Sequence, residues 1–349
     1  MKILFVSYSR GWGFLEDTYN YVFKPLGSKH FRIRGYKSYA SLLASISLRK
    51  YDVIWCEESG FIPTMWRYFL RKNRLTNNLY RNRETKILTR FHFHNCAEYL
   101  SVRTWKAVEN IAESDMVLSV SNYWKNTIKR NLPFMDLDVH VVHNGVDTSR
   151  FVPDPALKQE KTIFYLASTY HRKRLHLLIK AMNHLPDFRL IIGGTCKPFN
   201  VQVEQRIMDE DVPEECYDSA NYWNWCHKLA KPNEERIVWK GFVSEETKLQ
   251  CYQKASIFVL PSTIESWGVV LMEAMSCKLP ILGTNNGGTP EFVPKNQLLP
   301  LDLPPEHLAA RIRQLDGDTQ IGAHNRKIVA KYDWPEIRSE VDSCLASIK

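Results

Sequence analysis

The fold is decided by the stretch Leu260-Pro261-Ser262-Thr263-Ile264-Glu265-Ser266-Trp267-Gly268-Val269-Val270-Leu271-Met272-Glu273-Ala274-Met275. An apolar strand ends near Leu260, and a helix is expected to begin near Ser266. A strand that leads directly into a helix is the repeating unit of α/β folds. The first N–H groups of the helix and its dipole attract an anion, and Gly268 lets the anion approach the backbone. The stretch therefore predicts a phosphate site at a strand end.

Two glutamates, Glu265 and Glu273, flank this site eight positions apart. If the residues between them are helical, their Cα atoms lie about 12 Å apart. Carboxylate oxygens accept hydrogen bonds from paired sugar hydroxyls. The spacing therefore suits a nucleotide sugar, with its diphosphate on the helix start, its ribose on one glutamate and its hexose on the other.

Short apolar runs on both sides of this stretch alternate with segments long enough for helices, which is typical of a doubly wound parallel sheet. The predicted strands are 3–6, 52–55, 86–89, 116–120, 162–166, 189–194, 237–239, 256–260 and 280–283. Turn signals at Asn144-Gly145 and at Pro153-Asp154-Pro155 interrupt the alternation. We therefore expect two Rossmann-like domains, 1–155 and 156–331, facing a central cleft that binds the ligand.

Length and composition agree with this organisation. The 349 residues are 44% hydrophobic, which suggests two soluble domains. No apolar run reaches the roughly 18 residues of a membrane span, and no signal peptide is recognisable at the start. The eight cysteines form no Cys-x-x-Cys pair, which argues against zinc and disulfides and favours a cytoplasmic protein.

The positive charge is concentrated at the N-terminal end. Residues 1–100 hold 17 Lys and Arg against 7 Asp and Glu, whereas residues 101–349 hold 30 against 31. Residues 64–83 contain six basic residues and no acidic one, with aromatic residues at helical spacing. They are interpreted as an amphipathic helix at an anionic membrane surface, or as a helix packed on the domain with a solvated basic edge. No nucleic-acid motif accompanies the charge.

A longer excursion, residues 197–233, lies between two predicted strands and is rich in aromatic residues. It is interpreted either as a surface excursion with one extra helix or as a lid that contacts the acceptor.

The central stretch resembles the retaining glycosyltransferases of family 4, which have the GT-B fold. Their pattern P-S-x-x-E-x-x-G-x-x-x-x-E-A is matched at Pro261, Ser262, Glu265, Gly268, Glu273 and Ala274, and their G-G-x-P-E at Gly287, Gly288, Pro290 and Glu291. Residues 144–147 are similar to the hinge motif of the family. Residues 332–349 are similar to its C-terminal helix, which crosses back to the N-terminal domain.

The resemblance implies the roles of several donor-site residues. Glu273 would hold the ribose hydroxyls, and Glu265 would hold hydroxyls of the transferred sugar. The diphosphate would lie on the helix start, which comprises Ser266, Trp267, Gly268 and Val269. The nucleobase would meet the backbone around Phe242 and Val243.

The family also has an arginine and a lysine that bind the phosphates. Lys173 occupies the lysine position, but Ser168 stands where the arginine is expected. A fixed cation stabilises the charge of the leaving group, so its loss would matter. The same loop holds His171, Arg172 and Arg174, and one of them is expected to supply the missing charge; Arg172 is assigned to the donor site.

In the N-terminal half, the resemblance points to His94, which follows a predicted strand and would contact the transferred sugar. His92 is interpreted as a core residue. A loop with Gly11 and Gly13 follows the first strand and would approach the donor phosphates, or is a plain turn. Glu57 and its neighbour Glu58 are interpreted as acceptor-side carboxylates or as solvated loop residues.

Together these features predict a retaining hexosyltransferase that moves a sugar from a nucleotide-diphosphate sugar to a hydroxyl acceptor, such as a lipid-linked or cell-envelope glycan. No Asp-x-Asp is found at a predicted strand end, and the family implies no metal and no cofactor. The alternatives are an epimerase or hydrolase of nucleotide sugars, a non-catalytic family member, and a protein that keeps the fold but only binds membranes or nucleic acid. The protein is expected in the cytoplasm, peripherally on the inner face of the membrane.

Overall fold

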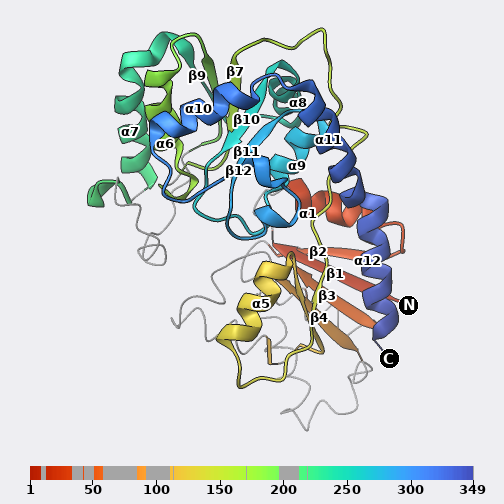
Figure 1. Ribbon diagram of the computed structural model, residues 1–349. Coiled ribbons are helices and arrows are strands. Elements are labelled where there is room, and N and C mark those ends of the chain that lie inside the picture. Colours follow the sequence, from red (N-terminus) through yellow and green to blue (C-terminus); the bar gives the residue numbers. More distant parts are fainter. Residues whose placement is uncertain are drawn as a thin grey trace. The chain divides into compact units, whose positions relative to one another are not determined.

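The chain forms two compact units, which are shown in a computed structural model (Figure 1). Unit 1 comprises Met1–Gly145 together with Trp334–Lys349, and unit 2 comprises Val146–Asp333. The structure describes residues 1–8, 13–33, 42, 51–57, 85–91, 111–112, 114–169, 171–195, 212–217 and 219–348. The basic segment 64–83 and the histidines at 92 and 94 lie outside these residues.

Unit 1 is built on a six-stranded parallel sheet of order β2-β1-β3-β4-β5-β6. Its strands are β1 (Ile3–Tyr8), β2 (Lys29–Ile33), β3 (Val53–Glu57), β4 (Lys86–Phe91), β5 (Met116–Ser119) and β6 (Val139–Val141). The central strands are buried along their length, as the predicted apolar runs require. Four of these strands were predicted, whereas the edge strands β2 and β6 were not.

The described helices of unit 1 are α1 (Gly13–Thr18), the π-helical turn η1 (Tyr19–Phe23), α5 (Asn122–Asn131) and α12 (Trp334–Ser347). Phe23 of η1 packs on Phe5 and Trp55, with ring centroids 4.6 and 4.9 Å apart. Helix α12 contacts η1, and Trp334 stacks on Tyr21 at 5.5 Å. The end of the chain is therefore part of the N-terminal unit.

Unit 2 repeats this plan with a parallel sheet of order β12-β11-β10-β7-β8-β9. Its strands are β7 (Thr162–Leu166), β8 (Arg189–Gly193), β9 (Ile237–Gly241), β10 (Ile257–Leu260), β11 (Ile281–Thr284) and β12 (Leu298–Leu299). The first five match predicted strands. β12 was not predicted because two residues are too few for a recognisable apolar run.

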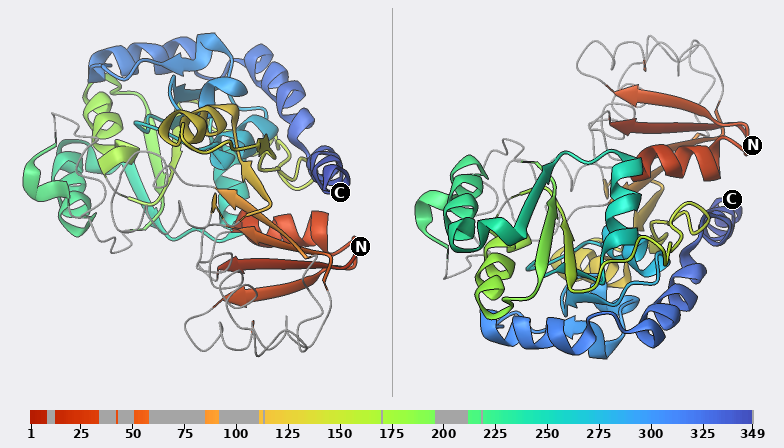
Figure 2. Two further views of the ribbon diagram at one scale, coloured as in Figure 1. Left: turned by 90° about the horizontal axis from the view of Figure 1, so that it is seen from below. Right: turned by 90° about the horizontal axis from the view of Figure 1, so that it is seen from above.

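Helices cover both faces of the unit 2 sheet (Figures 1 and 2). On one face α6 packs against α7 and α10, and on the other α9 packs against α11. The helices are α6 (Leu175–Ala181), α7 (Ser219–Ala230), α8 (Glu245–Lys254), α9 (Val269–Ser276), α10 (Pro305–Leu315) and α11 (Thr319–Val329). α7 belongs to the excursion at 197–233, and its Tyr222 is buried against α6.

The division between the units lies at Gly145, earlier than the position after residue 155 that the proline cluster suggested. Phe151 explains the difference. It is 1% exposed, packs on Tyr252, and its carbonyl accepts hydrogen bonds from Ser276 and Arg326. The segment before the prolines is therefore anchored in unit 2.

None of the helices in the described part of the chain is long and apolar enough to cross a membrane.

Candidate functional site

The candidate donor site lies at the carboxyl ends of β7, β8, β9 and β10, which meet at one edge of the parallel sheet. The backbones approach one another closely here, and glycines permit it. Gly194 has φ of +126°, and a Cβ on it would lie 1.8 Å from the carbonyl oxygen of Ala167. Its N–H donates to the carbonyl of Gly241 at 2.8 Å. The loops that follow β7, β8 and β9 are therefore held close together at this edge.

Lys173 and Glu265 form the central contact of the site. The Lys173 Nζ lies 2.5 Å from Glu265 Oε1, and the two side chains are only 13% and 14% exposed. Lys173 ends a 3₁₀ turn, η4 (His171–Lys173), whereas Glu265 lies in the loop that follows β10. The structure thus brings together two predicted site residues that are 92 positions apart.

Backbone hydrogen bonds hold both partners of this pair in place. The Thr263 N–H donates to the Arg172 carbonyl at 2.8 Å, which joins η4 to the loop after β10. The Gly288 N–H donates to the Glu265 carbonyl at 2.9 Å. Gly287 has φ of +70°, and a Cβ there would lie 2.1 Å from the same carbonyl oxygen. The first glycine of the Gly-Gly motif is therefore required by the close approach of two loops.

The Lys173 cation determines the charge state of Glu265. Burial alone would raise the pKa of this carboxyl, but the charge and hydrogen bond of Lys173, together with a hydrogen bond of Ser262, act against burial, and the pKa lies below its usual value. Arg172 adds a smaller effect in the same direction. Glu265 is therefore an ionised acceptor of hydrogen bonds at neutral pH.

Glu273 lies on α9 and is held by two residues of α8. Lys248 Nζ lies 2.7 Å from Glu273 Oε1, and the Tyr252 hydroxyl donates to Oε2 at 2.9 Å. Burial raises the pKa of Glu273, and the charge and hydrogen bond of Lys248 oppose this effect. Neither Lys248 nor Tyr252 was predicted as part of the site, because nothing in the sequence of α8 marks them as partners of a residue on another helix.

Between the two glutamates, the chain turns into α9. The helix begins at Val269 rather than near Ser266, so the residues from Glu265 to Gly268 are not helical. The distance of about 12 Å between the Cα atoms of Glu265 and Glu273, which assumed a continuous helix, therefore does not apply. Gly268 adopts a left-handed conformation, φ +85° and ψ +53°, as the N-cap of α9. The ring of Trp267 is buried against Phe292 and Tyr332. This packing fixes the direction in which the first amides of the helix point.

The two residues expected at the nucleobase follow β9. Phe242 is 78% exposed, and Val243 is half-buried. A Cβ on Gly193 would lie 3.4 Å from Val243 Cγ1, so Val243 borders the glycine edge of the sheet.

The basic loop offers three candidates for the charge missing at Ser168, which is exposed. Burial, with a smaller effect of Arg172, lowers the pKa of His171 to about 4, so this imidazole is neutral at pH 7. The Arg174 guanidinium donates to the Leu301 carbonyl at 2.7 Å. Arg172 is the residue whose charge acts on Glu265. Electrostatics therefore favours Arg172, rather than His171 or Arg174, as the source of the charge that is missing at Ser168.

In unit 1, Glu57 and Arg90 lie at the ends of β3 and β4 and are both 1% exposed. The Trp55 Nε1–H donates to Glu57 Oε1 at 2.8 Å, and Arg90 lies 3.4 Å from the same oxygen. Glu57 is therefore a buried partner of these side chains and not a solvated loop residue. Gly13 begins α1, whereas Gly11, His92 and His94 lie outside the described residues.

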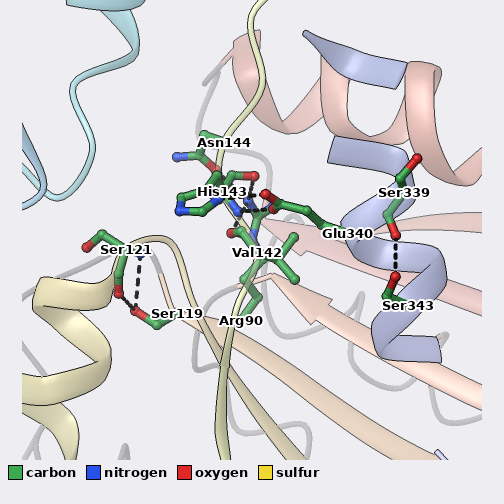
Figure 3. A network of polar contacts seen from close by, with 9 residues as sticks. All are labelled: Arg90, Ser119, Ser121, Val142, His143, Asn144, Ser339, Glu340 and Ser343. Carbon is green, nitrogen blue, oxygen red and sulfur yellow. Dashed lines mark hydrogen bonds and ion pairs between the residues drawn. The ribbon is translucent and has the colours of Figure 1, made fainter. Parts of the chain in front are cut away.

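The Arg90 guanidinium also anchors the end of unit 1 (Figure 3). It donates to the carbonyls of Val142 and His143 at 2.9 and 2.6 Å and to Asn144 Oδ1 at 2.8 Å. From α12, Glu340 accepts from the His143 N–H at 2.8 Å and pairs with its Nδ1 at 2.7 Å. This network fixes the segment that carries the Asn-Gly motif.

Chemically, the unit 2 site combines a cation, the start of a helix and two buried carboxylates, which suits a ligand with an anionic centre and hydroxyl groups on both sides. Within the described ranges, no group of three His, Cys, Asp or Glu side chains is placed to hold a metal ion.

Comparison with protein families gives two matches. Residues 148–327, more than half of the chain, match the family model described as Glycosyl transferases group 1. Residues 3–150 match the model described as Glycosyltransferase Family 4. Together they bear out the resemblance that the motifs indicated.

Two curated relatives illustrate the range of similarity. An alpha-maltose-1-phosphate synthase of Mycolicibacterium smegmatis is 24% identical over 206 residues, which cover 55% of this chain and 49% of that protein. One subunit of the human phosphatidylinositol N-acetylglucosaminyltransferase is 27% identical over 210 residues, which cover 58% of this chain and 39% of that protein. The chain therefore spans half or less of the length of these relatives.

Solved structures show the same architecture. HepE of Anabaena, in complex with UDP and glucose, superposes with a TM-score of 0.74 at 18% identity and covers 99% of this chain and 100% of its own. A sucrose-phosphate synthase of Thermosynechococcus elongatus gives 0.73 at 16% identity, with 100% and 99% covered. The predicted two-domain α/β fold of the GT-B type is confirmed.

Proposed function

Because this chain belongs to the glycosyl transferases group 1, we propose that it is a retaining hexosyltransferase that uses a nucleotide-diphosphate sugar. The observation that carries the proposal is the contact between Lys173 and Glu265 beside the start of α9, with Glu273 on the same helix. A lone Glu-x7-Glu spacing has little meaning, whereas a buried cation paired with the first glutamate supplies the charge that a diphosphate needs.

In the proposed mechanism, the donor diphosphate lies on the first amides of α9 and near Lys173. Charge develops on the leaving phosphate as the bond to the sugar breaks, and a fixed cation in a partly buried site stabilises that charge. Glu265 then holds hydroxyls of the transferred sugar. Because the Glu265 carboxylate is already oriented by Lys173, little reorganisation is needed when the donor binds.

The reaction retains the anomeric configuration in this proposal. The departing phosphate accepts the proton of the acceptor hydroxyl on the face from which it leaves, so the protein need not supply a base on the opposite face. His94 would contact the transferred sugar, and Gly11 and Gly13 would approach the phosphates. Their roles rest on the family resemblance.

Arg172 would replace the arginine missing at Ser168. The neutral state of His171 and the bond from Arg174 to Leu301 support this assignment. We expect Arg172→Met to reduce donor turnover by about 10- to 100-fold, whereas Arg172→Lys keeps most of it. Steady-state rates with one donor test the assignment; a normal rate for Arg172→Met would contradict it.

The acceptor is proposed to be a hydroxyl of a lipid-linked or cell-envelope glycan. The excess of ten positive charges in residues 1–100 supports an anionic surface as the place of action. The name of the human relative, which refers to phosphatidylinositol, is consistent with such an acceptor. The protein would then be cytoplasmic and peripheral on the inner face of the membrane. No metal and no cofactor are expected to take part.

The proposal is tested by measuring nucleoside diphosphate released from UDP-, GDP-, ADP- and dTDP-sugars, with and without vesicles of anionic phospholipid. We expect release from one nucleotide class, loss of release in Glu273→Ala, and a higher rate with vesicles. Proton NMR of the product then reports its anomeric configuration.

Each alternative predicts a different outcome. An epimerase or hydrolase would turn the donor over at full rate with no acceptor present. A non-catalytic member would release nothing, even with lipid extract as a source of acceptor. An inverted anomer in the product would contradict the retaining mechanism while leaving the transferase intact.

A further inference from the structure

Lys248 is a nearly buried cation that the mechanism above does not use. Its side chain is 12% exposed, and its Nζ lies 2.7 Å from Glu273 Oε1 and 3.0 Å from Glu245 Oε2. The Nζ also lies 5.0 Å from the centroid of the Phe151 ring. Burying a lysine is costly unless it is paired, so the close contact with Glu273 needs an explanation.

The two oxygens of Glu273 each receive one donor from α8. Lys248 reaches Oε1, and the Tyr252 hydroxyl reaches Oε2 at 2.9 Å and the Val270 carbonyl at 3.0 Å. A carboxylate oxygen has two lone pairs, so each oxygen keeps one for a ligand. The two contacts therefore fix the plane of the carboxyl group and leave it able to accept two further hydrogen bonds.

We propose that Lys248 is a positioning residue for the donor ribose, which orients Glu273 to accept hydrogen bonds from both ribose hydroxyls. This inference rests on the proposed function, because Glu273 is the residue assigned to the ribose there. It adds a residue on a second helix to that assignment and gives a preference for ribose over 2′-deoxyribose a physical cause.

The charges around Glu273 show how strongly Lys248 affects the pKa of this carboxyl. Three groups on α8 act on this carboxyl, namely Lys248, Glu245 and Tyr252. Cys277, at the end of α9, adjoins it, and the charge of Arg326 on α11 acts on Cys277. Burial and the charge of Glu245 raise the pKa of Glu273. Lys248 provides the largest opposing effect.

The consequence of losing Lys248 follows from this balance. Without the cation, the pKa of Glu273 rises further, so a larger fraction of this carboxyl is protonated at a given pH. A protonated carboxyl carries an O–H donor and has less capacity to accept from two hydroxyl groups. Binding of a ribonucleotide should therefore weaken at neutral pH and recover as the pH rises and the carboxyl ionises.

The test is calorimetric binding of UDP, GDP and ADP, and of their 2′-deoxy forms, to the full chain between pH 6 and pH 9. For the unsubstituted protein, we expect one ribonucleotide to bind more tightly than its 2′-deoxy form at every pH. For Lys248→Met, we expect the affinity at pH 7 to fall by about tenfold, which is the size of loss expected when one hydrogen bond to a charged group is weakened. The preference for ribose should fall with it, and both should recover toward pH 9.

Three variants separate positioning from a merely structural role. Lys248→Arg keeps the charge and should restore binding at pH 7. If Lys248→Met does not fold, Lys248→Gln takes its place, and we expect the same loss of affinity at pH 7. Lys231→Met removes a lysine from an exposed pair with Glu234 and should bind as the unsubstituted protein does.

Two results would overturn the inference. One is normal binding by folded Lys248→Met or Lys248→Gln. The other is an affinity loss that is equal at every pH and leaves the preference for ribose unchanged. If the unsubstituted protein binds none of the three ribonucleotides but releases nucleoside diphosphate from one of the sugar donors, only this inference fails. If it neither binds a nucleotide nor releases one, the proposed function fails as well.

Discussion

Replacing Lys173 by methionine leaves the Glu265 carboxylate without its cation. The two side chains are 13% and 14% exposed, so this is a nearly buried pair. Removing one partner of a buried pair costs about 3–5 kcal/mol, and the remaining exposure favours the lower end of that range. A cost of about 3 kcal/mol corresponds to a fall of roughly 6–12 °C in the melting temperature of a domain of this size.

The cost should depend on pH in a definite direction. In the unsubstituted protein the pKa of Glu265 is lowered, so its ionised form adds stability above the unfolded pKa, and this stability is lost as the pH falls through the folded pKa. In Lys173→Met, burial is opposed only by the smaller effects of Ser262 and Arg172, so the pKa of Glu265 rises and the variant is penalised increasingly as the pH rises. The difference between the two proteins should be large at pH 7 and smaller near pH 4.

Thermal and urea unfolding of the full chain at both pH values measure this difference for the transition of unit 2. The double variant Lys173→Met with Glu265→Gln should recover part of the loss, because it removes the unpaired charge. The exposed substitution Lys231→Met should leave the melting temperature unchanged. A loss that is the same at pH 4 and pH 7, or a double variant that adds both single losses, would refute the reasoning.

Further predictions concern the glycine edge of unit 2 and the buried network of unit 1. Gly194→Ala should destabilise the protein by more than about 3 kcal/mol, because its Cβ would lie 1.8 Å from the Ala167 carbonyl oxygen. Gly317→Ala, at a left-handed position with open space around it, should cost only about 1 kcal/mol in the same urea titration. Arg90→Met should cost about 3–5 kcal/mol, with part of it recovered by adding Glu57→Gln. Equal effects of the two glycine variants, or an Arg90→Met protein with normal stability, would contradict these predictions.

Much of the fold was predictable because the central strands are local signals. Runs such as Ile163-Phe164-Tyr165 are buried on both faces of a parallel sheet, so they are continuously apolar. The edge strands β2 and β6 were missed for the opposite reason. β2 begins with Lys29 and His30 and has Arg32 between its two apolar residues, and the strand pairs with a neighbour on one side.

The candidate site was predictable where its residues belong to one motif. Glu265, Gly268 and Glu273 could be assigned together because they belong to one motif that runs from Pro261 to Ala274. Lys248 was missed, because its relation to Glu273 arises from the packing of α8 against α9 and leaves no fixed spacing in the sequence. Similarly, the start of α9 at Val269 depends on the left-handed conformation of Gly268.

The most direct test of the central claim is a crystal structure of the chain with the nucleoside diphosphate that it releases. We predict that the terminal phosphate lies within hydrogen-bond distance of the amides of Gly268 and Val269 and close to Lys173. We also predict that both ribose hydroxyls bind the Glu273 carboxylate, with Lys248 still bound to that carboxylate. A nucleotide that binds elsewhere, or a ribose that makes no contact with Glu273, would contradict the account.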